Sequence, residues 1–409
     1  MNLRTFTWIL VLAGYATLAV SLPLTAQEQP QRPSHNQMPR ITVFEDGNAS
    51  NTNPSQSPCY SNCPGTTAFA NNLENATVGY YYDDNAVAHG LLRAADGSIT
   101  TLDAPGAGST KNSQQGTVAY SINLEGEIAG QFEDSSNGYH GFVRSKDGNY
   151  TQIDVRDAGP IGTFAVAINW EGTVAGYFYD ANNNLHGFVR TRDGRITQID
   201  GPGACTLTDN TNCTQTLVSL ETGINAEGSI IGWYFGPDGV NHGYVRSPDG
   251  TMTTIDVPGT PTNAVTGTIP ASINARGEIA GGYSDSNMLT HGFVRHCDGT
   301  FDSFDAPGTK ANPVTDTFAV GIAASGTTTG YYVDSYNVSY GFVRLANGTL
   351  LTFEAPGTGT GNGQGTTPQS INDLGFVTGY STDSSNVNHG FVRCPDAVFY
   401  PWPGNGPHH

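Results

Sequence analysis

Apolar residues recur along this chain in short runs of strand-like order, and turn residues separate the runs. Residues 117–155 illustrate the pattern: apolar-rich runs lie at 117–122, 127–132, 140–144 and 150–155. Asn123-Leu124-Glu125-Gly126 separates the first pair and Lys146-Asp147-Gly148 the last pair, both with Gly where a hairpin needs a positive φ. No stretch beyond the N-terminus has a helical period. The pattern predicts an all-β protein built from antiparallel hairpins.

One of these runs is nearly the same each time it occurs. It reads His-Gly-(Phe or Tyr)-Val-Arg in five copies, and two further copies differ by one class of residue. The copies begin 51, 46, 56, 49, 49 and 49 residues apart, which indicates an array of equivalent units. They start at His89, His140, His186, His242, His291, Tyr340 and His389.

Four antiparallel strands in each unit of about 49 residues are typical of a β-propeller blade. We therefore predict a single seven-bladed β-propeller of four-stranded antiparallel blades over residues 41–404. The turn Ile-Asn-x-x-Gly recurs in most units, and Asn75 takes the place of its Gly in unit one. Two segments, 41–45 and 397–402, resemble a fourth strand. One of them is expected to complete the last blade from outside its own unit.

The repeat resembles a known family. Gly-Glu-Ile-Ala-Gly followed by a turn, His-Gly-Phe-Val-Arg and an Asp-Gly turn is similar to the extracellular HAF repeat of secreted bacterial proteins, over nearly all of residues 66–404. Gly and Arg here replace the Ala and the aromatic residue that often follow the His and the Phe of that motif. The resemblance implies a secreted, propeller-like protein and no settled biochemical activity.

The N-terminus has the pattern of a secretory signal. Arg4 precedes an apolar run from Phe6 to Leu22, so residues 1–26 are interpreted as a signal peptide, with an uncleaved anchor as the alternative. A flexible leader follows at 27–40, and residues 405–409 form a tail. The remaining chain has 16 basic and 36 acidic residues, a net charge of −20, which argues against nucleic acid as a partner. We expect a secreted monomer, extracellular or periplasmic, with no membrane span after processing.

The cysteines agree with an oxidising compartment. Two close pairs predict the disulfides Cys59–Cys63 and Cys205–Cys213. Zinc ligation is the alternative, but no His lies at ligand spacing beside either pair. We predict neither a metal nor a cofactor, and Cys297 and Cys394 are left unpaired.

The repeated polar residues are interpreted as structural. Asp precedes the repeated His by six residues in most units. A His–Asp pair that occurs in most blades is poorly suited to be one active site. We expect the Asp to close a hairpin and to accept a hydrogen bond from the His. The repeated Arg is expected to pair with the carboxylates that end the fourth strands. The residues concerned are His89, His140, His186, His242, His291 and His389, Asp134, Asp180, Asp285 and Asp383, and Arg144 and Arg190.

Ligand binding is expected where the repeat is broken. The loops between second and third strands and the crossovers between units emerge on one face, which we call the loop face. The tight turns emerge on the other, the turn face. Unit four departs most, with the longest crossover and the sequence Gly232-Trp233-Tyr234-Phe235, although Trp233 could equally fill a seam. The candidate binding residues are Trp233, Tyr234, Asp238, Asp209, Glu133 and Tyr139.

Three functions remain open. A secreted recognition module for glycans or another envelope component is the first, because no unique catalytic group stands out. An extracellular polysaccharide hydrolase or lyase is the second, with Glu133, Asp238 and Glu221 as possible carboxylates. A structural or cation-binding surface protein is the third. For the first, changing Trp233 should weaken binding far more than changing Trp170, which is predicted on the turn face.

Overall fold

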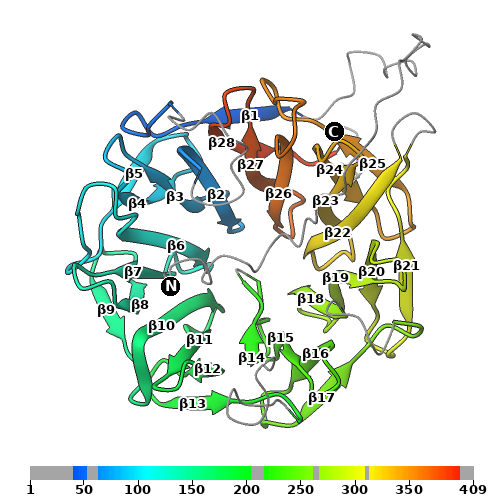
Figure 1. Ribbon diagram of the computed structural model, residues 1–409, viewed down its shortest axis with the longest axis horizontal. Helices are drawn as coiled ribbons and strands as arrows, with labels where there is room; N and C mark the ends of the chain where they lie inside the picture. The colour runs from blue at the N-terminus through cyan, green and yellow to red at the C-terminus, as the bar shows by residue number, and fades with distance from the viewer. Residues whose placement is uncertain are drawn as a thin grey trace, which may run out of the picture.

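A computed structural model describes residues 40–52, 63–203, 216–220, 222–260, 267–308 and 313–396. These residues form 28 β-strands, and none of them is helical. The strands lie in a ring around a central axis (Figure 1). The all-β prediction is confirmed.

Antiparallel pairing groups the strands into seven sets of four. Sets one to three are β2 (Gly65–Asn71), β3 (Thr77–Tyr82), β4 (Ala88–Arg93), β5 (Ile99–Leu102); β6 (Gly116–Ile122), β7 (Ile128–Glu133), β8 (Tyr139–Arg144), β9 (Tyr150–Ile153); and β10 (Ala158–Ile168), β11 (Val174–Asp180), β12 (Leu185–Arg190), β13 (Ile196–Ile199). Sets four and five are β14 (Thr216–Val218), β15 (Ile230–Phe235), β16 (Asn241–Arg246), β17 (Met252–Ile255); and β18 (Thr268–Ile273), β19 (Ile279–Ser284), β20 (Thr290–Arg295), β21 (Phe301–Phe304). Sets six and seven are β22 (Val314–Ile322), β23 (Thr328–Asp334), β24 (Ser339–Arg344), β25 (Leu350–Phe353); and β26 (Gly365–Ile371), β27 (Val377–Thr382), β28 (Asn388–Arg393), β1 (Ile41–Phe44).

The sets are not wholly separate sheets. The third strand of one set touches the first strand of the next through a single parallel pair, as at Ala88 and Gly116. Five such contacts join six sets into one 24-stranded sheet, while β14–β17 form a sheet of their own. Gly116 has φ 129°, and a Cβ there would lie 1.9 Å from the carbonyl oxygen of Ala88. Glycine is therefore required for this close approach.

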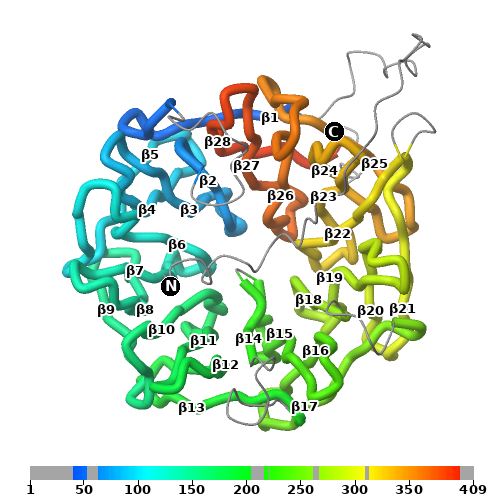
Figure 2. Tube along the Cα trace, viewed as in Figure 1, coloured from blue at the N-terminus to red at the C-terminus, as the bar shows by residue number. Residues whose placement is uncertain are grey.

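The last set is completed by the first strand of the chain. β1 pairs with β28 from Ile41 opposite Arg393 to Phe44 opposite Gly390. The N-terminal end of the described chain thus lies along the outside of its C-terminal end (Figures 1 and 2). Of the two segments predicted to supply this strand, 41–45 does so, and 397–402 lies outside the described residues. This pairing covers the edge of β28 and gives the last set four strands like the others.

Buried side chains fill the seams between neighbouring sets. β6 is buried along its whole length, because the innermost strands are covered on both faces. The largest core cluster spans sets one to four and is rich in aromatic residues. Phe69 stacks on Tyr120 with ring centroids 5.3 Å apart, and Tyr139 stacks on Phe164 at 4.8 Å. Burial of such rings contributes most of the driving force that holds adjacent sets together.

A row of buried threonines binds the sets together on the loop face. The backbone N–H just after the end of each fourth strand donates to the hydroxyl of a Thr on the first strand of the next set, at 2.8–3.2 Å. This bond occurs at all seven seams, and each Thr is fully buried. The residues are Thr66, Thr117, Thr163, Thr216, Thr268, Thr317 and Thr366. Each bond fixes the end of a fourth strand against its neighbour.

A row of asparagines joins neighbouring sets on the turn face. This role explains why the Ile-Asn-x-x-Gly turn contains Asn. The Oδ1 of each Asn accepts a backbone N–H within its own turn, and its Nδ2 donates to a backbone carbonyl in the turn of the next set at 2.8–3.2 Å. The donors are Asn72, Asn123, Asn169, Asn225, Asn274 and Asn372. Ala323 stands at the seventh position, where the backbone N–H of Ala324 donates to Asp373 instead.

Candidate functional site

Each repeated His lies on the loop face between two carboxylates. In set two, His140 Nδ1 is 2.8 Å from Asp154 Oδ1, and Nε2 is 3.5 Å from Asp134 Oδ2. Asp134 also closes its hairpin, because its Oδ1 accepts the backbone N–H groups of Ser136 and Gly138. The His–Asp contact expected from the sequence is thus present. The same arrangement surrounds His89, His186, His291 and His389.

The second carboxylate corrects the interpretation of the repeated Arg. Residues that end the fourth strands, Asp103, Asp154, Asp200, Asp256 and Asp305, bind the repeated His and not the Arg. The reason is the antiparallel pairing of third and fourth strands. It brings the end of the fourth strand back beside the His, whereas the Arg lies opposite the start of that strand, as Arg144 lies opposite Tyr150.

Four of the seven repeated Arg side chains pack on aromatic rings. Arg93 lies 5.0 Å from the ring centroid of Phe44, Arg344 lies 4.7 Å from Phe304, and Arg393 lies 4.8 Å from Phe353. In these three cases the ring belongs to the fourth strand of the preceding set. The seam location was therefore predicted correctly for these three, and in two of them a carboxylate adds to the π face: Arg344 lies 3.5 Å from Asp302, and Arg393 donates to Asp396 at 2.8 Å. Arg144 packs on Tyr150 of its own set.

The carboxylates favour the protonated form of several repeated His. The hydrogen bond to Asp103 raises the pKa of His89, and that to Asp200 raises the pKa of His186, in both cases against the effect of burial. Burial also opposes protonation of His242, but its bonds to Asp256 and Asp238 outweigh it and raise the pKa. On the acidic side, the backbone N–H of Gly138 lowers the pKa of Asp134. These groups stabilise one another as charged pairs.

The predicted binding residues of unit four are largely occupied by structural contacts. Tyr234 is buried, stacks on His242 and shares a hydrogen bond with Thr254. Trp233 is half-buried and packs against the aromatic core cluster. Asp238 contacts His242 Nε2 at 3.1 Å, so it takes the place of the repeated Asp although it precedes the His by only four residues.

The other predicted residues do not join them. Glu133 and Tyr139 face each other across β7 and β8 in set two, where Tyr139 stacks on Phe164. Sets two and four are not neighbours in the ring, so Glu133 and Asp238 do not form a carboxylate pair (Figure 1). Asp209 and Glu221 lie outside the described residues.

The predicted disulfides fall mostly outside the described residues too. Cys63 is disulfide-bonded. Cys59, Cys205 and Cys213 are not described, so the pairings Cys59–Cys63 and Cys205–Cys213 remain predictions. Cys297 and Cys394 are free.

The large apolar side chains that are exposed in the described chain gather in two groups. One group, Met288, Leu289 and Tyr336, lies in the loops between second and third strands of sets five and six, on the loop face. The other, Leu73, Leu124, Trp170 and Leu374, lies in the turns between first and second strands, on the turn face. Exposed apolar side chains that cluster mark candidate interaction sites.

A pocket of about 410 Å³ opens beside the first group, at the seam between sets five and six. Leu289, Pro313 and Val314 supply apolar wall, while the His291–Asp305 pair, Thr290 and Thr315 supply polar groups. His291 Nδ1 lies 2.7 Å from Asp305 Oδ1, and more than half of the Asp305 side chain is exposed. The loop that carries Tyr336 adjoins this wall, because the Ser335 N–H donates to the Pro313 carbonyl at 3.1 Å. We call this region the seam pocket.

The backbone at Met288 is unusual. Met288 has φ 64° and a side chain that is 53% exposed. Most of the equivalent loops place Asn or Gly at this left-handed position, as at Asn137 and Gly239, because those residues tolerate it best. A long apolar side chain is therefore held at the rim of the pocket at a cost to the backbone, which is typical of functional loops.

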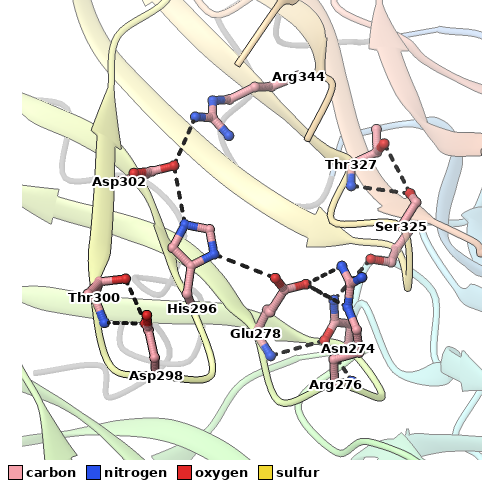
Figure 3. Close-up of polar contacts among 11 residues, drawn as sticks. Asn274, Arg276, Glu278, His296, Asp298, Thr300, Asp302, Ser325, Thr327 and Arg344 are labelled. Carbon is pink, nitrogen blue, oxygen red and sulfur yellow. Dashed lines mark hydrogen bonds and ion pairs between the residues drawn. The ribbon is translucent and has the colours of Figure 1, made fainter. Parts of the chain in front are cut away.

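A second departure from the repeat lies at the same seam, on the turn face. His296 lies 3.5 Å from Glu278 and 3.2 Å from Asp302, and Asp302 is 3.5 Å from Arg344 of set six (Figure 3). Arg276 binds Glu278 at 2.6 Å. Acidic and basic side chains therefore alternate along a chain of contacts that links set five to set six. Units one to four have Ala94, Ser145, Thr191 and Ser247 where His296 stands, a departure that was visible in the sequence.

Other site classes find little support in the described residues. No group of three or more His, Cys, Asp or Glu side chains among them is arranged to hold a metal ion. No helix long and apolar enough to cross a membrane occurs in that part of the chain. The candidate chemistry is therefore that of the seam pocket, in which hydrogen-bonding groups face an apolar wall.

No protein-family model matches the chain, and no curated protein matches it in sequence. Solved structures do match. A virginiamycin B lyase from Staphylococcus aureus is 13% identical with a TM-score of 0.52, over 87% of this chain and 99% of that one. A structure from a study of two prolyl endopeptidases is 11% identical with a TM-score of 0.52, over 80% of this chain and 50% of that one. The BP39L lectin from Burkholderia pseudomallei is 10% identical, over 81% of this chain and 95% of that one, with a TM-score of 0.48. The likeness to the first two structures shows that this chain has a propeller-type fold.

Proposed function

We propose that this chain is a secreted seven-bladed β-propeller that binds glycans through the seam pocket. The observation that carries the proposal is the pocket itself. It joins hydrogen-bonding groups to an apolar wall that includes Leu289, and the exposed residues Met288 and Tyr336 lie in the adjoining loops. Elsewhere in the described chain, the exposed large apolar side chains lie on the opposite face.

The blade count rests on the repeating contacts. A set of four strands and a Thr bond to the next set occur once in each of seven units, and the pairing of β1 with β28 supplies the fourth strand of the last set. This repetition supports the assignment of one blade to each set. Bonds between the sets account for the continuity of the larger sheet.

The ligand class follows from the chemistry of the pocket. A pyranose ring has apolar C–H faces and hydroxyl groups at its edge, so it suits a site with both kinds of wall. Asp305 keeps one carboxylate oxygen beyond its bond to His291, and Thr290 and Thr315 add hydroxyls. Tyr336, 59% exposed in the adjoining loop, offers a ring face for stacking.

Secretion is part of the proposal and rests on the sequence. The apolar N-terminal run, the close Cys pairs and the resemblance to HAF repeats support it. N-terminal sequencing of the mature protein supplies the measurement. An intact N-terminal segment in that protein would contradict secretion by this signal.

The binding test compares two equivalent carboxylates. We expect Asp305→Asn and Tyr336→Ser to weaken binding on a glycan array by roughly five- to thirtyfold, because each removes a direct ligand contact worth roughly 1–2 kcal/mol. Asp103→Asn is the matched control. Asp103 holds His89 as Asp305 holds His291, but it does not line the pocket. Both Asn variants should lose similar stability, and only Asp305→Asn should lose binding.

Two outcomes would contradict this assignment. Equal loss of binding in Asp103→Asn and Asp305→Asn would mean that the His–Asp pairs act only through stability. A greater loss in Trp233→Ala than in either pocket variant would move the site to set four, where the sequence alone had suggested it.

The enzyme alternative keeps one specific observation in its favour. His291 lies in the pocket between Asp305 and Asp285, an arrangement that can hold and transfer a proton. A reducing-sugar release assay on the polysaccharides that bind decides between the two. Release that is abolished in His291→Gln would establish the enzyme, and binding without release would establish the module.

A further inference from the structure

The second group of exposed apolar side chains lies on the turn face, away from the seam pocket. Leu374, Leu73, Leu124 and Trp170 occupy the turns between first and second strands in sets seven, one, two and three. These sets follow one another around the ring (Figure 1). We call the four residues the apolar arc.

The turns of the arc are physically joined. Asn372 donates to the carbonyl of Asn72, Asn72 to that of Asn123, and Asn123 to that of Asn169. Each apolar residue follows one of these Asn by one or two positions. The bonds hold the four turns side by side, so the apolar residues belong to one continuous, rigid surface close to the axis.

The exposure of these side chains is not a requirement of the turn. The equivalent position carries Ala226, Ala275 and Ala324 in sets four, five and six. Leu124 is 48% exposed and Trp170 is 50% exposed, so large apolar groups face water where Ala serves elsewhere. Trp170 is also held in place, since its Nε1 donates to the Ala226 carbonyl at 3.0 Å. A rigid Trp beside exposed Leu side chains is typical of an interaction site.

Acidic residues accompany each apolar one. Glu74, Glu125, Glu171 and Asp373 are exposed neighbours of Leu73, Leu124, Trp170 and Leu374 in the sequence. Of the basic residues on the adjoining turns of sets two and three, Arg192 is paired with Glu127 at 2.8 Å, whereas Lys146 and Arg195 are exposed and are outnumbered by the acidic residues of these turns. The surface is therefore apolar and negatively charged, within a chain of net charge −19.

We propose that the apolar arc docks a cationic amphipathic peptide segment of a partner protein. Its apolar residues would cover the Leu and Trp side chains, and its Lys or Arg residues would pair with the flanking carboxylates. A second copy of this chain is a poorer occupant, because two such faces repel each other. An anionic membrane surface is disfavoured for the same reason.

The probe is a fluorescent amphipathic Leu–Lys peptide, and the comparison is the matched Leu–Glu peptide. Fluorescence anisotropy should detect binding of the first and not the second, and binding should weaken as salt is raised. Leu124→Ser should weaken binding of the Leu–Lys peptide roughly tenfold, the effect expected for losing a covered Leu side chain. Leu289→Ser is the matched control, since it removes a Leu of comparable exposure, 40% against 48%, from the loop face.

A second pair of variants separates the arc from the net charge of the chain. Glu125→Gln with Glu171→Gln should weaken binding several-fold, whereas Asp84→Asn with Asp157→Asn changes the net charge equally on the loop face and should not. Thermal melts confirm that each variant is folded. Equal losses in the two pairs, equal losses in Leu124→Ser and Leu289→Ser, or equal binding of the Leu–Glu peptide would overturn the proposal. Concentration-dependent dimers abolished by Leu124→Ser would overturn it in favour of self-association.

Discussion

At the scale of single residues, the repeated His owes its place to its two nitrogens. Nδ1 and Nε2 each contact a carboxylate from a different segment, one ending the fourth strand and one closing the loop before the third strand. Tyr340 replaces His in set six, and its hydroxyl donates only to Asp334. In set seven the His contacts Glu45, which follows β1 at the other end of the chain. One side chain thus fixes three segments on the loop face.

The charged state of these groups predicts the pH dependence of stability. The pKa values of His89, His186 and His242 are raised above 6.5. Their contribution to the free energy of unfolding is therefore complete below pH 6.5 and is lost as the pH rises through the raised values. The pKa values of four carboxylates, Asp83, Asp134, Asp180 and Asp285, are lowered below 3.8. Their contribution to the free energy of unfolding is complete above pH 3.8 and is lost as the pH falls through the lowered values. The free energy of unfolding should therefore be greatest between about pH 4 and 6.5.

Urea denaturation across this range checks the prediction. The midpoint should fall between about pH 6 and pH 9, and the fall should be smaller when His89, His186 and His242 are all replaced by Gln. A midpoint that rises over the alkaline range would show that these His residues are not stabilised as cations.

At the scale of elements, the seams depend on small polar side chains. The Thr bonds secure the loop face and the Asn bonds the turn face, so each pair of neighbouring sets is held at both ends of its innermost strands. Asn123 shows why Asn is needed. Its Oδ1 accepts the Glu127 N–H in its own turn while its Nδ2 donates to Asn169, and Asp has no donor for the second bond.

Asn123→Asp should therefore lower the free energy of unfolding by about 1–3 kcal/mol, because it leaves the Asn169 carbonyl buried without its donor. Asn182→Asp is the control, since Asn182 is exposed and only its backbone N–H is used. Equilibrium unfolding of both variants gives the comparison. Equal stability of the two would mean that the bond across the seam contributes nothing.

At the scale of the whole molecule, the ring is closed by four residues from the start of the described chain. β1 supplies the outer strand of set seven, and Glu45 just beyond it contacts His389. Phe44 also covers Arg93 of set one across the seam. Two sets therefore depend on this segment, although it is remote in sequence from set seven.

Removal of residues up to Glu45 should open the ring. We expect a lower melting temperature and a broader, less cooperative transition, because the edge of β28 and the Arg93 guanidinium lose their partners. A chain that begins at residue 40 is the control and should melt as the full chain does. Calorimetry compares the two, and identical transitions would contradict the role assigned to β1.

The sequence by itself determined the all-β class, the repeating unit, the strands and the positive φ of Asn75, which is 59°. These features are local. Strand order, turn residues and the positions of the His and Arg can be read along each unit, and they recur from one unit to the next. The two faces could be assigned as well, because they follow from the alternation of strand direction.

Only the tertiary structure decided which residues meet between units. The buried Thr and Asn bonds, the aromatic partners of Arg93 and Arg344, and the pairing of Glu45 with His389 join residues of different sets. The seam pocket also belongs to two sets, and neither Leu289 nor Val314 is distinctive in its own unit. A repeat pattern specifies what each unit contains, but contacts between units depend on how closely backbones approach, as at Gly116 and Ala88. That approach is fixed by closing the ring.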